Sequence, residues 1–331
     1  MAGMRIALPA LLLALAGLGA TEPRRLLLET RLEDFGEAAY GRAVETTLAE
    51  FEARTGRRLT PGERGRCALK VSTAPGPGMS TPRNLIRATA DALARRGFGP
   101  GSVVVCDGDS RRMRRAGFLP LNPLEPARLG ELPVRAWDLE CQAWAEDDRY
   151  AYENPVPPAP GVDLPGWHNP RRSLLPRPLA EEFDFWVHLP VATDSADLGV
   201  HGAVACASLG NATNTARFAG NPRNAAMASI EMAAWPAIDG RRAITLMSLE
   251  RYQVRGGPAF DAGWMRSERT LLGSANPLIL DQVALLRIRA ARGEAPDAGG
   301  EPALFQAAAG GGAALGPARP ADVTLVRLGA R

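Results

Sequence analysis

Lys70 is the only lysine in a chain of 331 residues that holds 39 lysines and arginines in total. It lies in the apolar run Cys67–Ser72, directly before a loop rich in glycine and proline. A guanidinium stays charged under nearly all conditions, whereas a desolvated lysine amine can lose its proton and act as a base or nucleophile. Lys70 is therefore a candidate site residue. The alternative is a codon bias that turned nearly every basic residue into arginine and left one lysine.

The run around Lys70 has the composition of a β-strand, and the next apolar run ends at Asp107. Successive side chains of a strand alternate between its faces, so Lys70 and Ser72 share a face. An ammonium inside a covered sheet needs a carboxylate partner or loses its proton. We predict a pair of Lys70 with Asp107, flanked by Ser72 and Asp109, in a crevice. A lysine that extends from the sheet edge into water is the alternative.

The second half of the chain adds hydrogen-bonding side chains within a stretch of small residues, 201–218. A guanidinium there suits a carboxylate or phosphate. We predict Asp194 as a third catalytic residue beside Lys70 and Asp107. The predicted ligand-binding residues of this half are His201, Asn211, Asn214, Arg217 and Glu250. The loop 75–78 and the start of the following helix would offer free amides to an anion.

Other kinds of site lack their motifs. The chain has three histidines and four cysteines, and no two cysteines have the Cys-x-x-Cys spacing of clusters and structural zinc sites. Phosphate-loop, dinucleotide and hydrolase-elbow patterns are also missing from the sequence. We therefore predict no metal and no cofactor, and expect mostly free, buried cysteines.

The composition of the chain excludes some classes of binding partner. The chain is 46% apolar and 23% charged, with a formal net charge of +3, as in ordinary globular proteins. Its acidic and basic residues alternate without a basic tract, so nucleic acid is not an expected partner. Residues 1–20 have the pattern of a secretory signal peptide, and no later segment is apolar enough to span a membrane. We expect an exported protein whose partner is a small anion; the sequence does not predict its oligomeric state.

Three times the chain repeats an apolar strand, a polar loop, a capping residue with proline, and an amphipathic helix. These βαβ-type units predict an α/β fold with a mostly parallel central sheet and helices on both faces, in two lobes. A surface helix within 31–55 should precede the first strand. The expected divisions are the signal peptide 1–20, a first lobe 21–153, a Pro-rich crossover 154–178, and a second lobe 179–331 with a mobile Gly/Ala-rich tract 293–321.

Several of these segments resemble the bacterial family catalogued as domain of unknown function 362. The resemblance covers roughly residues 65 to 292, and its matching pieces are Leu69–Ser72, Ser80–Pro82, Asp107–Ser110, Phe183–Pro190, His201–Asn211, Gly256–Pro258, Ser274–Pro277 and Asp281. The family has no assigned activity, so the resemblance implies none. Some relatives carry a ferredoxin-like module, whose cysteine spacing is not found here. The layout is also similar to the amino-terminal domain of nickel-dependent lactate racemases, but three histidines are too few to carry over their metal ligands.

Two functions remain open from the sequence. The first is an exported protein with an anion-binding, catalytic crevice at the carboxyl ends of the strands, where open α/β folds bind ligands. The second is a non-catalytic periplasmic binding protein whose two lobes close on a small molecule. Catalysis requires Lys70 to be desolvated and within hydrogen-bond reach of a carboxylate.

Overall fold

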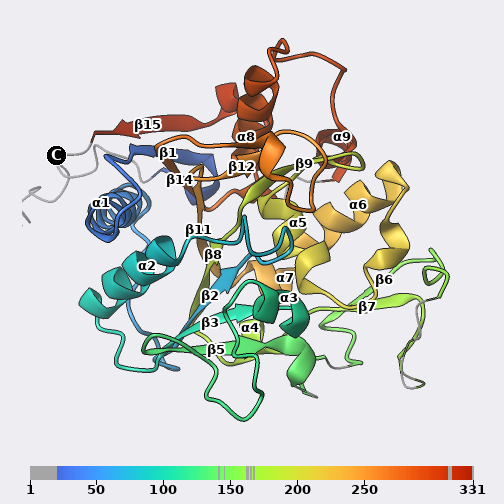
Figure 1. The fold of residues 1–331 in the computed structure, drawn as a ribbon, viewed down its shortest axis with the longest axis horizontal. Helices are drawn as coiled ribbons and strands as arrows, with labels where there is room; N and C mark the ends of the chain where they lie inside the picture. The colour runs from blue at the N-terminus through green and yellow to red at the C-terminus, as the bar shows by residue number, and fades with distance from the viewer. Residues whose placement is uncertain are drawn as a thin grey trace, which may run out of the picture.

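The computed structural model describes residues 21–140, 142–144, 146–161, 164, 166, 168–311 and 315–329. The expected signal peptide lies outside these residues, as do Cys141 and Trp167. The described chain forms a large, mostly parallel sheet with helices on both faces (Figure 1). The predicted α/β fold class is confirmed.

The main sheet has nine strands. From one edge to the other they are β15 (Thr324–Leu328), β1 (Leu26–Arg31), β14 (Thr270–Ser274), β11 (Arg242–Ser248), β8 (Phe185–Leu189), β2 (Cys67–Val71), β3 (Val103–Asp107), β5 (Leu132–Ala136) and β4 (Arg128–Leu129). From β11 to β5 all neighbours are parallel. At either side, β14 runs antiparallel to β11 and β1, and β4 runs antiparallel to β5.

Every residue of the central strands β2, β3 and β8 is buried, so the sheet needs a cover on each face. One core contains side chains of α1 (Glu37–Thr55), α2 (Arg83–Arg95) and α3 (Ser110–Arg115). The opposite core contains those of α4 (Arg177–Glu181), α5 (Ala203–Ala207), α6 (Pro222–Ala233), α7 (Pro236–Asp239), α8 (Pro277–Ala291) and α9 (Ala303–Gly311). In Figure 1, α1 and α2 lie to the left of the sheet and α5, α6 and α9 to its right.

Two small sheets complete the fold. One consists of β10 (Gly199–His201), β9 (Ala192–Ser195), β12 (Tyr252–Gln253) and β13 (Met265–Arg266). The other is a hairpin of β6 (Ala151–Glu153) and β7 (Arg172–Leu174). The hairpin includes part of the Pro-rich segment 154–178.

Several expectations need correction. A strand, β1, precedes the helix expected within 31–55, which itself begins at Glu37. The third unit is no parallel βαβ unit, because β14 is antiparallel to both neighbours. The tract 293–321 contains helix α9, whose Leu304 and Phe305 are buried, so this part is packed and not a mobile linker. Strands from both halves of the chain share the nine-stranded sheet, so the crossover 154–178 does not divide the sheet.

The first βαβ unit forms as expected, with one shift at the start of its helix. Helix α2 begins at Arg83 and follows Pro82, which has extended backbone geometry. Thr81 does not cap this helix: its hydroxyl oxygen accepts from the Ser72 amide at 2.8 Å and donates to the Leu189 carbonyl at 2.5 Å. Thr81 therefore ties the ends of β2 and β8 together.

Candidate functional site

Lys70 lies near the carboxyl end of β2 and is completely buried. In the parallel register it stands between Cys106 of β3 and His188 of β8. Its ammonium donates to Asp107 Oδ1 at 2.8 Å, to the Val71 carbonyl at 2.8 Å and to Cys206 Sγ at 3.4 Å. An ammonium has three N–H groups, so all three have a partner within the protein.

Asp107 completes the pair from the end of β3 and is 5% exposed. Its Oδ1 also accepts from the Gly108 amide at 2.8 Å, and its Oδ2 accepts from the amide and hydroxyl of Thr73 at 3.0 and 2.6 Å. Burial is the largest single influence and lowers the pKa of Lys70, but the charge and hydrogen bond of Asp107, together with the neighbouring Cys206 and Cys106, outweigh it, and this pKa lies above its ordinary value. Lys70 is therefore a cation and not a free amine base, and its raised pKa suits a donor of charged hydrogen bonds better than a donor of protons.

The pair lines a narrow pocket, which we call the Lys70 pocket. The centre of a water molecule has about 10 Å³ of space inside it, which is room for roughly one water. Its lining residues are Lys70, Ser72, Thr73, Ala74, Asp107, Asp109, Arg112, His201, Cys206 and Gly210. The structure thus brings together five of the predicted site residues: Lys70, Ser72, Asp107, Asp109 and His201.

The Lys70 pocket lies where the direction of the chain's crossovers changes. The helix after β2 covers one face of the sheet, whereas the helices after β8 cover the other. The chain therefore leaves the carboxyl ends of β2 and β8 toward opposite faces of the sheet, and open α/β sheets bind ligands beside such a point. The pocket's position agrees with that rule.

His201 and Arg112 lie at the same pocket from different elements, β10 and α3. Burial lowers the pKa of His201 to about 4, and the charges of Arg112 and Lys70 add to this effect. His201 is therefore neutral at pH 7. Arg112 is exposed and lies 3.3 Å from Asp109, which also caps α3 by accepting from the Arg112 amide. A guanidinium and a neutral imidazole thus stand beside the buried ammonium.

Cys206 also lines the pocket, although the sequence predicts it only as a buried thiol. Its sulfur accepts one N–H of Lys70. Burial raises the pKa of the thiol, although the charge of Lys70 acts in the opposite direction. Its place within the apolar run Ala203–Ala207 gives no local signal of this contact, because α5 reaches Lys70 only through packing. Cys67 and Cys106 are also free and buried, as expected.

Four predicted residues lie elsewhere. Asp194 forms an ion pair with Arg292 at the end of α8. Asn214 donates to the carbonyls of Pro170 and Arg172, both at 3.0 Å. None of these residues lines the Lys70 pocket. A catalytic role of Asp194 together with Lys70 does not fit this arrangement.

Arg217 is buried and donates to the carbonyls of Asn154 and Val156, both at 2.9 Å, and to the Ser173 hydroxyl at 3.1 Å. These bonds fasten the β6–β7 hairpin, and the predicted carboxylate or phosphate partner is not needed. Glu250 accepts from the Tyr40 hydroxyl at 2.8 Å and lines a separate pocket of about 270 Å³ beside the start of α2. Glu250 is therefore not part of the Lys70 pocket.

Asn211 stays a candidate next to the pocket. It is completely buried, and among the described residues neither polar atom of its amide has a hydrogen-bond partner. A Cβ on Gly108 would lie 3.0 Å from the Gly210 carbonyl oxygen and 3.8 Å from the Asn211 Cα. The backbone of Gly210 and Asn211 therefore packs directly on Gly108, which follows Asp107. Buried amides without partners are rare in native proteins.

His188 is completely buried beside Lys70, and within the described chain neither ring nitrogen has a partner. Burial, together with the charges of Lys70 and Arg242, lowers its pKa well below 6.5. The unfolded chain thus takes up a proton that the fold excludes, so the contribution of His188 to stability falls as the pH drops below about 6.5, by about 1.4 kcal/mol per pH unit. We expect His188→Leu to weaken this loss, measured from urea unfolding at pH 7.5 and 5.0. Equal losses in both proteins would contradict the prediction.

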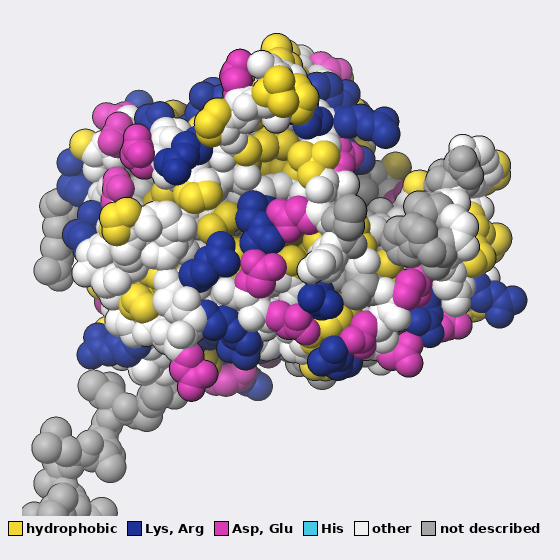
Figure 2. Space-filling model, turned by 90° about the horizontal axis from the view of Figure 1, so that it is seen from below, with side chains coloured by type: hydrophobic (Ala, Val, Ile, Leu, Met, Phe, Trp, Pro, Cys, Tyr) yellow, Lys and Arg dark blue, Asp and Glu magenta, His cyan; other side chains and the backbone are white. Residues whose placement is uncertain are grey.

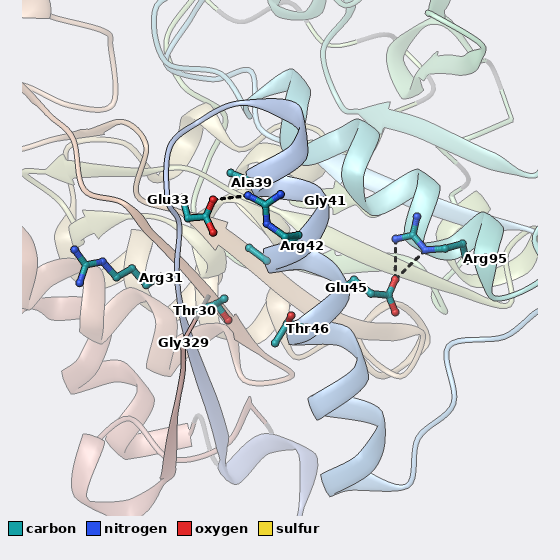
Figure 3. A pocket seen from close by; sticks show the side chains of 11 residues that line it. Thr30, Arg31, Glu33, Ala39, Gly41, Arg42, Glu45, Thr46, Arg95 and Gly329 are labelled. Carbon is teal, nitrogen blue, oxygen red and sulfur yellow. Dashed lines mark hydrogen bonds and ion pairs between the residues drawn. The ribbon is translucent and has the colours of Figure 1, made fainter. Parts of the chain in front are cut away.

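A larger pocket, of about 430 Å³, lies between β1, the first turns of α1 and Gly329 (Figure 3). Four of its five charged side chains form pairs: Arg42 with Glu33, and Arg95 with Glu45 at 2.8 Å. These four side chains are 40–53% exposed, so water already screens them. The pocket is larger than the Lys70 pocket but contains no buried ionisable group.

The surface carries mixed charge. Figure 2 shows a face on which basic and acidic side chains are intermingled. Among the described residues, no helix is long and apolar enough to cross a membrane. The same part of the chain contains no group of three or more histidine, cysteine, aspartate or glutamate residues placed to hold a metal ion.

A comparison with family models found no match, and neither did a comparison with curated proteins. Among solved structures, the chain is similar to a structural-genomics target from Thermotoga maritima, with 10% identity and a TM-score of 0.38 over 76% of this chain and 58% of that one. It is also similar to a lactate racemase apoprotein from Thermoanaerobacterium thermosaccharolyticum, with 10% identity and a TM-score of 0.36 over 77% of this chain and 55% of that one. The chain therefore spans little more than half the length of either structure. Membership of the domain of unknown function 362 family stays a prediction.

Proposed function

We propose that this chain is an exported protein, related to the domain of unknown function 362 family, that binds a small anion in the Lys70 pocket and acts on it there, with the Lys70 ammonium as a charged hydrogen-bond donor. The observation that carries the proposal is the fully buried Lys70 ammonium, 2.8 Å from Asp107, at the carboxyl edge of the central sheet. Its geometry meets both requirements of the catalytic hypothesis: the amine is desolvated, and a carboxylate lies within hydrogen-bond reach.

The contacts of Lys70 indicate how an anion would bind. Of its three acceptors, the sulfur of Cys206 is the weakest, because thiols accept hydrogen bonds poorly. An anionic oxygen could take the place of Cys206 and receive a charge-assisted hydrogen bond. Arg112 would bind a second oxygen at the mouth. Since the pocket has room for about one water, the anionic group would be the end of a molecule that extends outside.

The test compares two neighbouring arginines of α3. Arg112 lines the pocket, whereas Arg111 is also exposed but does not. Acetate, oxalate, succinate and inorganic phosphate serve as probes in thermal-shift and calorimetric titrations. We expect Arg112→Gln to weaken binding of the best probe at least about tenfold, because a hydrogen bond to a charged group is lost. Arg111→Gln should bind as the parent does; equal effects of both variants would reject the site.

A non-catalytic binding protein is the second candidate, and the saturated contacts of the pair favour it. Every N–H of Lys70 and both oxygens of Asp107 are already bonded within the protein. Closure of two separate lobes does not fit a sheet that both halves of the chain share. Binding of a probe without turnover or isotope exchange in deuterated water would favour this candidate over a catalytic one.

A further inference from the structure

Three arginines surround one aspartate at the edge of the sheet opposite the Lys70 pocket. Arg24 precedes β1, Arg57 follows α1, and Arg242 begins β11, while Asp239 ends α7. We call these four residues the arginine cluster. It lies at the amino ends of β1 and β11, which run in the same direction because both are antiparallel to β14.

Asp239 is shared between two of the arginines. Its Oδ2 accepts from Arg24 Nη2 at 2.6 Å, and its Oδ1 accepts from Arg242 Nη2. Arg57 approaches from the side and donates Nη1 to the carbonyls of Arg242 and Ala243, at 3.1 and 3.3 Å. One carboxylate thus faces three guanidinium groups, which leaves a local excess of two positive charges.

The excess charge is buried. The side chain of Arg242 is 1% exposed and that of Arg24 is 29% exposed. The Nη1 atoms of both are inaccessible to water, and neither has a hydrogen-bond partner within the described residues. Buried donors and charges without partners are costly, and native proteins rarely leave them unsatisfied. Burial lowers the pKa of Arg57 and Arg242, and the positive neighbours lower both further.

The chain itself has few means to supply the missing counter-charge. Asp281 contributes to the field at Arg242, but its oxygens accept from the amides of Ala203 and Val204. Residues 312–314, which precede the segment packed on Arg24, are Gly, Ala and Ala, and residues 1–20 include no acid. Within the described residues no second carboxylate contacts these arginines, and water could satisfy the free donors without compensating their charge, whereas a bound anion would do both.

We propose that Arg24 and Arg242 bind a tetrahedral oxyanion, phosphate or sulfate, through their free Nη1 groups, with Arg57 adding charge. A dianion matches the excess of two positive charges, and guanidinium groups bind phosphate oxygens in directed pairs. Because both Nη1 atoms are inaccessible, the partly exposed Arg24 side chain must move for the anion to enter. The anion is either a free ion or the phosphoryl group of a larger molecule. The site is separate from the Lys70 pocket and does not depend on the function proposed for it.

The test uses the whole chain and Arg24→Gln, because Arg24 is partly exposed whereas Arg242 is fully buried. Arg25→Gln is the matched control: Arg25 is adjacent, 60% exposed and paired with Glu22 at 3.3 Å. Unfolding temperatures are measured with sodium phosphate or sulfate against sodium chloride at equal ionic strength. We expect saturating phosphate to raise the parent's Tm by roughly 2–4 °C more than chloride. Arg24→Gln should lose most of this increment, and Arg25→Gln should keep it.

Two further measurements identify the source of the anion and keep the proposal testable if Arg24→Gln does not fold. Phenyl phosphate that stabilises as well as inorganic phosphate points to a phosphoryl group on a larger molecule; stabilisation by the free ion alone points to inorganic anion. Arg57→Gln leaves Asp239 and its two arginine partners in place and should lower the rise in Tm caused by phosphate. This variant replaces Arg24→Gln if Arg24→Gln unfolds. No increment over chloride, or one lost only in Arg112→Gln, would overturn the proposal.

Discussion

Replacing Lys70 with methionine is expected to lower the free energy of unfolding by about 3–5 kcal/mol, the cost of removing one partner from a buried ion pair. The variant leaves the Asp107 carboxylate in the core with only the donors of Thr73 and Gly108. Domains have a total stability of about 5–15 kcal/mol, so the loss would be a large fraction. Urea unfolding followed by circular dichroism measures it.

Two further variants separate the pair from general damage to the core. Asp107→Asn alone should also destabilise, and the double variant Lys70→Met/Asp107→Asn should lose less than the sum, with a coupling of about 0.5–3 kcal/mol. Arg42→Gln is the control on an exposed pair, with side chains about half exposed, and should cost less than about 1 kcal/mol. A Lys70→Met protein within 1 kcal/mol of the parent would show that the pair contributes little to the fold.

The Lys70–Asp107 pair was accessible from the sequence because it lies within one βαβ unit. The strands β2 and β3 are joined by a single helix, and parallel neighbours bring their carboxyl ends to one edge. Alternation along β2 then directs Lys70 to a known face. No information from distant parts of the chain was needed to place these two residues together.

The site residues of the second half of the chain could not be predicted from the sequence in this way. Asp194, Asn214 and Arg217 were grouped by their polar character and closeness in sequence, but each pairs with a distant segment: α8, the turn before β7, and the β6–β7 hairpin. Cys206 reaches Lys70 across 136 positions. Such contacts depend on how helices dock on the sheet, which side-chain periodicity does not specify.

The same limit applies to the sheet edges. Strand β1 pairs with β14 and β15, which lie more than 200 residues later in the chain. The run 26–31 is apolar enough for a strand, but the first element predicted from the sequence is the helix within 31–55. Strand β14 lies between β1 and β11 and runs antiparallel to both. Local patterns predict elements, whereas partners and directions at long range follow from the packing of the whole sheet.

Stability between pH 4 and 7 is expected to depend on Asp281, and Asp281→Asn should remove this dependence. Burial raises the pKa of Asp281 to about 7 in the folded chain, although the amides of Val204 and Ala203 donate to its oxygens. Its ordinary value is 3.8. Between these values the folded state binds one proton more than the unfolded state. The contribution of Asp281 is therefore full below about pH 4 and falls, by on the order of 4 kcal/mol in total, as the pH rises to 7.

The measurement is the difference in unfolding free energy between the parent and Asp281→Asn at several pH values from 4 to 7.5. The difference is needed because His188 and His201 act in the opposite direction: their lowered pKa values make stability rise with pH up to about 6.5. Subtraction removes these histidines, which both proteins share. The parent should lose its advantage over the variant as the pH rises, while Glu33→Gln, on an exposed carboxylate, serves as the control. A difference that stays constant or grows with pH would mean that Asp281 is ionised in the fold, as a carboxylate fixed by the two α5 amides.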